Sequence, residues 1–340
     1  MQNLLDPAIL FFVFGVLAGA LRSNLEIPAA ISKFLSLYLL MALGLKGGFA
    51  LAKSGLTPEI ALSLGAAVAM AFIVPALGYA FLRHRVSRFD AAAVAAAYGS
   101  VSAVTFVTAM QFLESAGLKF GGHMAVAMVL MESPAIIMAV LLANTLRQAQ
   151  LAPAGMVVSA QGGAATATFG GGGGGGGLSI GKILHESFTD GAHLLLLGAM
   201  AVGYLSGDAG KAVMQPFSGD LFKGMLAFFL LDMGLMVARN FEQARKASPV
   251  LIAYAALGPV VHAAIALGLG WTLSLPVADA ALLMVLSASA SYIVVPAVLR
   301  YAIPEANPAL YFGLSLGITF PLNIIVGIPA YTEVARAVLG

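Results

Sequence analysis

The chain has 340 residues, of which 60% are hydrophobic and only 9% are charged, and its mean hydropathy is +0.96. Soluble domains carry about 25% charged residues, so this composition excludes a soluble globular protein. The net charge of +2 gives no sign of a nucleic-acid partner. The chain has no cysteine, which excludes disulfides and thiolate metal sites, and its five histidines form no His-x-x-x-His pair of the kind that favours zinc.

Ten apolar stretches follow one another along the chain, and most have the length of about 20 residues that crosses the hydrocarbon core of a bilayer. They cover residues 7–21, 29–52, 58–82, 89–113, 122–146, 187–206, 214–238, 248–273, 277–300 and 307–335. The segment before the first stretch carries an acid and no base, so we interpret that stretch as a retained helix and not a signal peptide. The sequence therefore predicts an all-α polytopic membrane protein with ten transmembrane helices.

One long hydrophilic segment, residues 148–185, divides the chain into a first half, 1–147, and a second half, 186–340. It contains the glycine run Gly170–Gly177, which is typical of a flexible linker. Basic residues gather in the loops after the third and seventh stretches, at Arg83, Arg85, Arg88, Arg239, Arg245 and Lys246. The positive-inside rule then places those loops and the linker in the cytoplasm of a bacterial inner membrane, with both termini outside.

The two halves carry matching motifs. The fourth stretch begins with Asp90-Ala-Ala-Ala and the ninth with Asp279-Ala-Ala-Leu, which we interpret as helix caps, and a proline-centred motif at Pro134 faces another at Pro321. Each half holds five stretches, an odd number, so the second half enters the membrane upside down. Inverted repeats with broken helices at the membrane midplane are typical of secondary transporters.

The strongest candidate site is a pair of Ser-x-Ser segments, because a gapless superposition of the two halves aligns them. The segments are Gly99-Ser100-Val101-Ser102 and Ser289-Ala290-Ser291. Serine hydroxyls can satisfy the backbone groups that an unwound turn leaves free, and the helix that resumes after the break points its positive dipole end at the break. Two such breaks would form a pocket for a small anion, with hydroxyl and carbonyl oxygens for Na⁺. The alternative is that these small residues only allow close helix packing.

Charged residues inside the apolar stretches are further candidates, since an ionisable group in a membrane span is costly and usually functional. Glu132, beside a proline in the fifth stretch, can act as a cation ligand or a proton carrier. Asp232 and Lys46 lie in segments that the repeat alignment places opposite each other, so we expect them to form a structural ion pair.

Several motifs together resemble the cyanobacterial sodium-dependent bicarbonate transporters and their bacterial relatives, over nearly the whole chain apart from the glycine-rich segment. These motifs are Ile303-Pro304-Glu305-Ala306-Asn307-Pro308 with Tyr311, Leu221-Phe222-Lys223-Gly224-Met225-Leu226 with Met233-Gly234, Pro259-Val260-Val261-His262, and Glu132-Ser133-Pro134-Ala135. The resemblance implies ten helices as five plus five, a homotrimer, and sodium-driven import of bicarbonate by an elevator motion.

The resemblance also implies which segments hold the ligands. Its substrate segments fall on residues 99–105 and 289–296. Within and beside these segments, Ser102, Thr105, Glu132 and Ser291 carry the oxygens that we expect to bind the coupling Na⁺. This chain departs from the family pattern at Tyr292, where the bicarbonate transporters place an acid, at Val104, and at Glu132, where they have Asp. The cyanobacterial members are also regulated by a PII-like protein at the cytoplasmic face, but the glycine-rich segment here does not resemble theirs.

The sequence thus favours a sodium-coupled importer of bicarbonate or a related small anion, with no cofactor other than the coupling ion. Proton coupling through Glu132, with a different small anion, is an alternative. A membrane-embedded enzyme would need polar groups converging near one interface, such as His with Asp, and none is evident.

Overall fold

The computed structural model describes residues 6–55, 57–151 and 191–340, and within these ranges it contains helices and turns but no strand. Helices satisfy their own backbone N–H and C=O groups, which a lipid-embedded chain requires. Most of the predicted linker, 148–185, lies outside the described residues; its first four residues complete α6.

The first half supplies six helices: α1 (Pro7–Ala20), α2 (Ala29–Ser54), α3 (Pro58–Leu82), α4 (Arg88–Gly99), α5 (Ala103–Ser115) and α6 (Met124–Leu151). The second half supplies α8 (Gly191–Gln215), α9 (Leu221–Arg245), α10 (Pro249–Thr272), α11 (Val277–Ala288), α12 (Val294–Ala302), α13 (Pro308–Leu314), α14 (Phe320–Leu322) and α15 (Ile328–Leu339). Wider π-helical turns join some of them, namely η2 (Pro216–Asp220), η3 (Ser315–Thr319) and η4 (Asn323–Gly327). Such turns inside helices often mark functional sites.

Among the described residues, seven helical segments are long and apolar enough to cross a membrane, compared with the ten stretches in the sequence. The difference arises at three places. The helix α1 has 14 residues, the segment from 194 to 242 runs on as one, and the break between α11 and α12 leaves two short pieces. A helix rises about 1.5 Å per residue, so α1 spans only about 21 Å.

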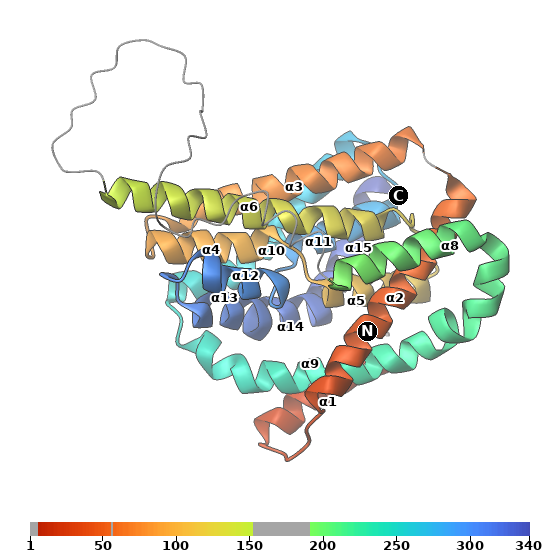
Figure 1. The fold of residues 1–340 in the computed structure, drawn as a ribbon, viewed down its shortest axis with the longest axis horizontal. Helices are drawn as coiled ribbons and strands as arrows, with labels where there is room; N and C mark the ends of the chain where they lie inside the picture. The colour runs from red at the N-terminus through yellow and green to blue at the C-terminus, as the bar shows by residue number, and fades with distance from the viewer. Residues whose placement is uncertain (1–5, 56, 152–190) are drawn as a thin grey trace, which may run out of the picture.

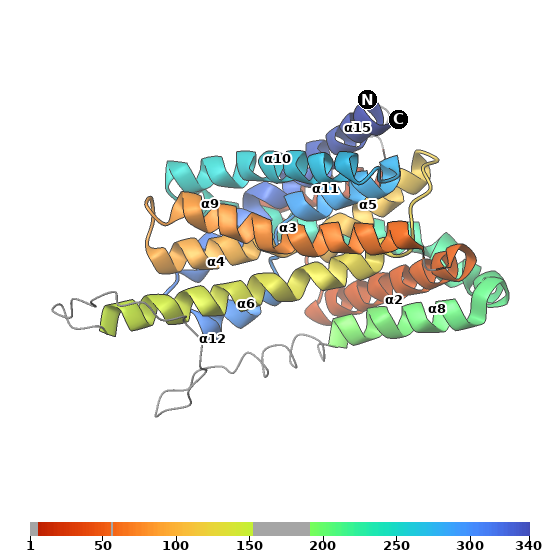
Figure 2. The same cartoon turned by 90° about the horizontal axis from the view of Figure 1, so that it is seen from above.

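The helices form two groups that each draw on both halves of the chain. In the four-helix group, α2 packs along α8, as Figures 1 and 2 show, and α1 packs on α9 (Figure 1). Glycines allow this close approach, since a Cβ added to Gly48 would clash with the Met200 carbonyl oxygen, and one added to Gly234 would clash with that of Phe12. All the other helices form the broken-helix group, in which α3 packs on α4 and α10 on α11.

Asp90 and Asp279 do not cap their helices as the sequence suggested. Ser87 is the N-cap of α4 and Pro276 precedes α11. The two carboxylates instead accept backbone N–H groups from the starts of other segments: Asp90 from Asn307 at 2.7 Å, and Asp279 from Gly121 at 2.7 Å. Each acid therefore ties the start of a broken helix to a segment of the other half.

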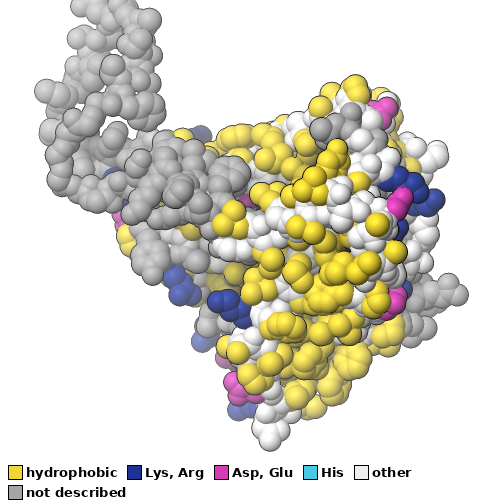
Figure 3. All heavy atoms as spheres, turned by 45° about the vertical axis from the view of Figure 1, so that its right-hand side comes forward, with side chains coloured by type: hydrophobic (Ala, Val, Ile, Leu, Met, Phe, Trp, Pro, Cys, Tyr) yellow, Lys and Arg dark blue, Asp and Glu magenta, His cyan; other side chains and the backbone are white. Residues whose placement is uncertain are grey.

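Large apolar side chains cover much of the outer surface. Figure 3 shows a face whose middle is mostly hydrophobic, with Lys, Arg, Asp and Glu side chains toward its edges. Exposed Phe14, Leu17, Leu205, Val213 and Trp271 are among the residues that contribute to such surfaces. An apolar surface with charges at its margins is the pattern of a protein that spans a membrane.

Candidate functional site

The paired Ser-x-Ser segments are the places where two helices break. Residues 100–102 interrupt the helical path between α4 and α5, and residues 289–293 interrupt it between α11 and α12. Ser100 and Ser289 leave the helical conformation, with extended backbone angles at the ends of α4 and α11. Residues 100–102 and 289–292 are buried, whereas Ile293 at the end of the second break is 55% exposed.

The two breaks are hydrogen-bonded to each other. The Ser291 N–H donates to the Ala97 carbonyl at 2.8 Å, and the Ser102 N–H donates to the Ser289 hydroxyl at 3.0 Å. The Ser289 hydroxyl in turn donates to the Leu286 carbonyl at 2.8 Å. Buried backbone groups need partners, so these bonds satisfy groups that the unwound turns would otherwise leave unpaired.

A cavity of about 80 Å³ lies at this crossing point. Its wall is built by both breaks together with α6 and α2, through Ser36, Leu40, Val101, Ser102, Ala103, Val104, Met128, Glu132, Ser291, Tyr292, Ile293 and Val294. The cavity is well below the roughly 300–1,000 Å³ of pockets for drug-sized ligands. It therefore suits a small ion more than a large organic substrate.

Two helix N-termini line this cavity. Ser102 is the N-cap of α5 and its hydroxyl accepts the Thr105 N–H at 3.2 Å, while the Ser291 hydroxyl accepts the Val295 N–H at 3.3 Å in the first turn of α12. Free N–H groups and the positive end of the helix dipole favour an anion at such a position. Glu132 lines the same cavity, and a carboxyl group is a ligand type that cations favour.

The structure brings five of the ten sequence-predicted site residues to the cavity wall: Val101, Ser102, Glu132, Ser291 and Tyr292. The other five are Gly99, Ser100, Thr105, Ser289 and Ala290, which surround the crossing without lining the cavity. Their binding roles stay predictions.

Each of these five non-lining residues has a structural setting of its own. Gly99 packs on the Pro75 ring, and Ala290 is buried. Thr105 and Ser289 bond to Ser102 through its side chain and its backbone, respectively. The Ser100 hydroxyl is buried without a hydrogen-bond partner among the described residues.

Tyr292 is buried and points its ring into the protein. The ring lies 5.3 Å from that of Phe320, centroid to centroid, and its hydroxyl lies 3.8 Å from the Met233 sulfur. Tyr292 thus fills space between the second break and the four-helix group, to which Met233 belongs.

Sequence reasoning missed Asn323, a buried residue in η4. Its amide nitrogen donates to the carbonyl of Ala288, the last residue of α11, at 2.8 Å, and its amide oxygen accepts the Tyr331 hydroxyl at 3.3 Å. Asn323 therefore satisfies a carbonyl beside the second break. Its one signal in the sequence was a lone polar side chain in an apolar stretch, close to the proline motif.

The predicted ion pair between Lys46 and Asp232 is wrong. The Lys46 ammonium group lies 3.0 Å and 3.1 Å from the two carboxylate oxygens of Glu114 in α5. Asp232 interacts instead with Ser32 and Arg239. The repeat alignment put the two segments in equivalent places of the fold, but equivalence between repeats does not place two side chains in contact.

A larger cavity of about 300 Å³ lies between α10 and α15. Its lining is almost wholly apolar, apart from Asn323 and Tyr331, whose polar groups bond to each other. It offers neither helix N-termini nor a carboxylate, so we place the candidate site in the smaller cavity at the crossing.

Comparison with known protein families agrees with this geometry. The model of the Na⁺-dependent bicarbonate transporter superfamily matches residues 7–336, nearly the whole chain. The chain belongs to this superfamily. The resemblance inferred from the sequence motifs is thereby confirmed. A comparison with curated proteins finds no match. Membership of the Na⁺-dependent bicarbonate transporter superfamily, together with the apolar helices, identifies a multi-pass membrane protein whose class is transport.

Proposed function

We propose that this protein is a secondary transporter, not an enzyme, that imports bicarbonate or a related small anion together with Na⁺. The observation that carries the proposal is the cavity at the crossing of the two breaks. It combines two helix N-termini, which favour an anion, with hydroxyl oxygens and the Glu132 carboxyl group, which favour a cation. A site that accepts both charges together suits coupled transport.

The contacts between helices support an inverted repeat. The start of α4 is bonded to the start of α13 through Asp90, and the start of α11 is bonded to the loop before α6 through Asp279. Since α5 ends only nine residues before α6 begins, the first broken helix ends near the place where the second begins. The two broken helices therefore run in opposite directions, as inversion requires. On this proposal all ten apolar stretches cross the membrane.

The arrangement of the two groups supports an elevator mechanism. Within the cavity wall, Ser36 and Leu40 come from the four-helix group, and the other residues come from the broken-helix group. A sliding motion between the groups would carry both breaks together, past α2. In this proposal the four-helix group also provides the contacts of a homotrimer in the lipid bilayer. Binding of a PII-like regulatory protein at the cytoplasmic face rests only on the resemblance to the cyanobacterial transporters.

Uptake of labelled bicarbonate into vesicles that contain the purified protein tests this function. We expect an inward sodium gradient to drive accumulation and a pH gradient alone to have little effect. Accumulation that follows the pH gradient and ignores sodium would support proton coupling through Glu132, the second candidate, which the position of this acid in the cavity favours.

The proposed location is the bacterial inner membrane, with both termini outside and the glycine-rich segment in the cytoplasm, as the basic loops indicate. Reporter fusions at Gly340 and within the glycine run at Gly174 should give opposite readings. A cytoplasmic reading at Gly340 would contradict this topology.

A further inference from the structure

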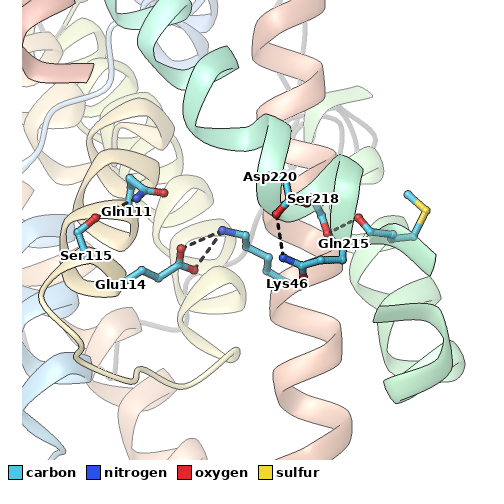
Figure 4. Close-up of polar contacts among 8 residues, drawn as sticks. Lys46, Gln111, Glu114, Ser115, Gln215, Ser218 and Asp220 are labelled. Carbon is cyan, nitrogen blue, oxygen red and sulfur yellow. Dashed lines mark hydrogen bonds and ion pairs between the residues drawn. The ribbon is translucent and has the colours of Figure 1, made fainter. Parts of the chain in front are cut away.

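The ion pair between Lys46 and Glu114 joins the two helix groups. Lys46 lies on α2 of the four-helix group, and Glu114 lies in the last turn of α5 in the broken-helix group. Figure 4 shows the lysine side chain reaching across from α2, with both carboxylate oxygens of Glu114 facing its ammonium group. Two bonds from one ammonium group thus connect the two helices.

A third partner holds the lysine in place. The Lys46 nitrogen also lies 4.1 Å from the centre of the Phe222 ring, which is buried on α9. A cation over an aromatic ring is attracted to it. The lysine is therefore anchored by its own group while its charge is directed at Glu114. Among the described residues, the other ion pairs between acidic and basic side chains, such as Arg147 with Glu305, lie within the broken-helix group.

The second half of the chain has no counterpart of this pair. The alignment of the repeats sets Met236 against Lys46 and Ile303 against Glu114. Neither residue can carry a charge, so the equivalent place in the second repeat cannot form an ion pair. The contact consequently distinguishes one end of the interface between the groups from the other.

We propose that Lys46 and Glu114 form a latch that stabilises the conformation seen here against the one in which the broken-helix group has moved along α2. The inference rests on the proposed elevator function, because a latch matters only if the groups move. The two side chains are partly exposed, at 19% and 35%, so water can replace the bonds when they open. Partly exposed pairs are weak, which suits a contact that must break in every cycle.

The absence of cysteine from the chain allows a direct test. A Cβ added to Gly47 on α2 would lie 3.4 Å from the Ala125 Cβ on α6, close to the spacing that a disulfide needs. In the variant Gly47→Cys/Ala125→Cys, the rate of disulfide formation reports how often the groups occupy this register. We expect Lys46→Met or Glu114→Gln to slow cross-linking about three- to tenfold, and the exchange Lys46→Glu/Glu114→Lys to restore much of the rate.

Lys53→Met, which removes an exposed lysine from the same helix, is the matched control and should leave the rate unchanged. Rates within twofold of each other in all these variants would overturn the latch, whatever the protein transports. If cross-linking responds as expected but no anion is taken up, the latch stands and the transport function fails. If the cysteine pair prevents folding, thermal unfolding of Lys46→Met, Glu114→Gln and the double variant decides. A latch predicts that the double variant is no less stable than the single variants, and additive losses would overturn it.

Discussion

The two broken helices have matching sequences, but different groups hold them at the crossing. In the first, the Ala97 carbonyl accepts a backbone N–H directly from Ser291. The equivalent residue in the second broken helix is Leu286, whose carbonyl accepts a hydrogen bond from the Ser289 hydroxyl. That hydroxyl in turn accepts the Ser102 N–H, so it bridges the two backbone groups. The serine that matches Ser289 in the first repeat is Ser100, and it has no such bond.

If the two halves form the proposed inverted repeat, this difference gives the candidate site unequal sides. Polar side chains hold the second break, through Ser289 and Asn323, whereas the first half contributes the carboxyl group of Glu132. The two halves thus share a backbone geometry at the breaks, but they differ in which polar side chains they contribute to the crossing. Pairs of equivalent residues then serve as matched controls for each other.

The largest effect is expected from the pair Glu132 and Thr319, which the proline motifs align. Glu132 lines the cavity, while Thr319 lies elsewhere, bonded to the Tyr98 hydroxyl at 2.6 Å and to the Ala255 carbonyl at 2.8 Å. Glu132→Gln should abolish coupled uptake, since losing one charged partner of a buried site costs roughly 2–5 kcal/mol. Thr319→Val should lower the melting temperature but change the apparent substrate constant only a few-fold. Wild-type uptake by folded Glu132→Gln would reduce this acid to a structural role.

A smaller effect should separate Ser289 from Ser100. Ser289→Ala leaves the Ser102 N–H without its partner, and an unpaired buried group costs about 1–3 kcal/mol. The apparent constants for substrate and sodium should therefore rise about ten- to a hundredfold, while Ser100→Ala should change them less than about threefold. Concentration-dependent uptake measures both. Equal effects of the two changes would show that the hydroxyl relay in the second break has no bearing on binding.

Asn323 provides a third comparison, because its counterpart in the first repeat, Ile136, has no amide group. Asn323→Leu removes the amide that bonds the Ala288 carbonyl and should raise the apparent substrate constant about three- to tenfold, since one buried bond is worth about 0.5–1.5 kcal/mol. Tyr331→Phe removes only the second bond of the amide and should have a weaker effect. The readout is the rise in melting temperature that bicarbonate and sodium produce. An unchanged rise in Asn323→Leu would argue against a positioning role.

The smallest and most specific effect concerns Tyr292, which aligns with Ala103 of the first repeat. Tyr292→Asp restores the acid of the bicarbonate transporters and should strengthen the dependence of uptake on sodium. Tyr292→Phe keeps the ring contact with Phe320 and should leave sodium dependence unchanged. If both variants show the same sodium dependence, this position does not tune the cation site.

The apolar stretches and the paired serines made the helices and their breaks predictable, because both depend on residues that are neighbours in the sequence. Contacts between distant segments were not predictable in the same way. Asn323 looked like one more residue of an apolar stretch until α11 was seen to end beside it. Lys46 was assigned the wrong partner, and Asp90 and Asp279 were taken for caps although they bond distant backbone. The partner is 35 residues away for Asn323 and more than 60 residues away for Lys46, Asp90 and Asp279, beyond the reach of local patterns.

The central claim is that the crossing of the two breaks is one binding site for a small anion and its coupling cation. A structure determined with sodium and bicarbonate tests it most directly. We expect ligand density in the cavity of about 80 Å³, within hydrogen-bonding distance of Ser102, Ser291 and the N-termini of α5 and α12. Density confined to another place, such as the cavity between α10 and α15, with the crossing empty at saturating ligand, would contradict the account.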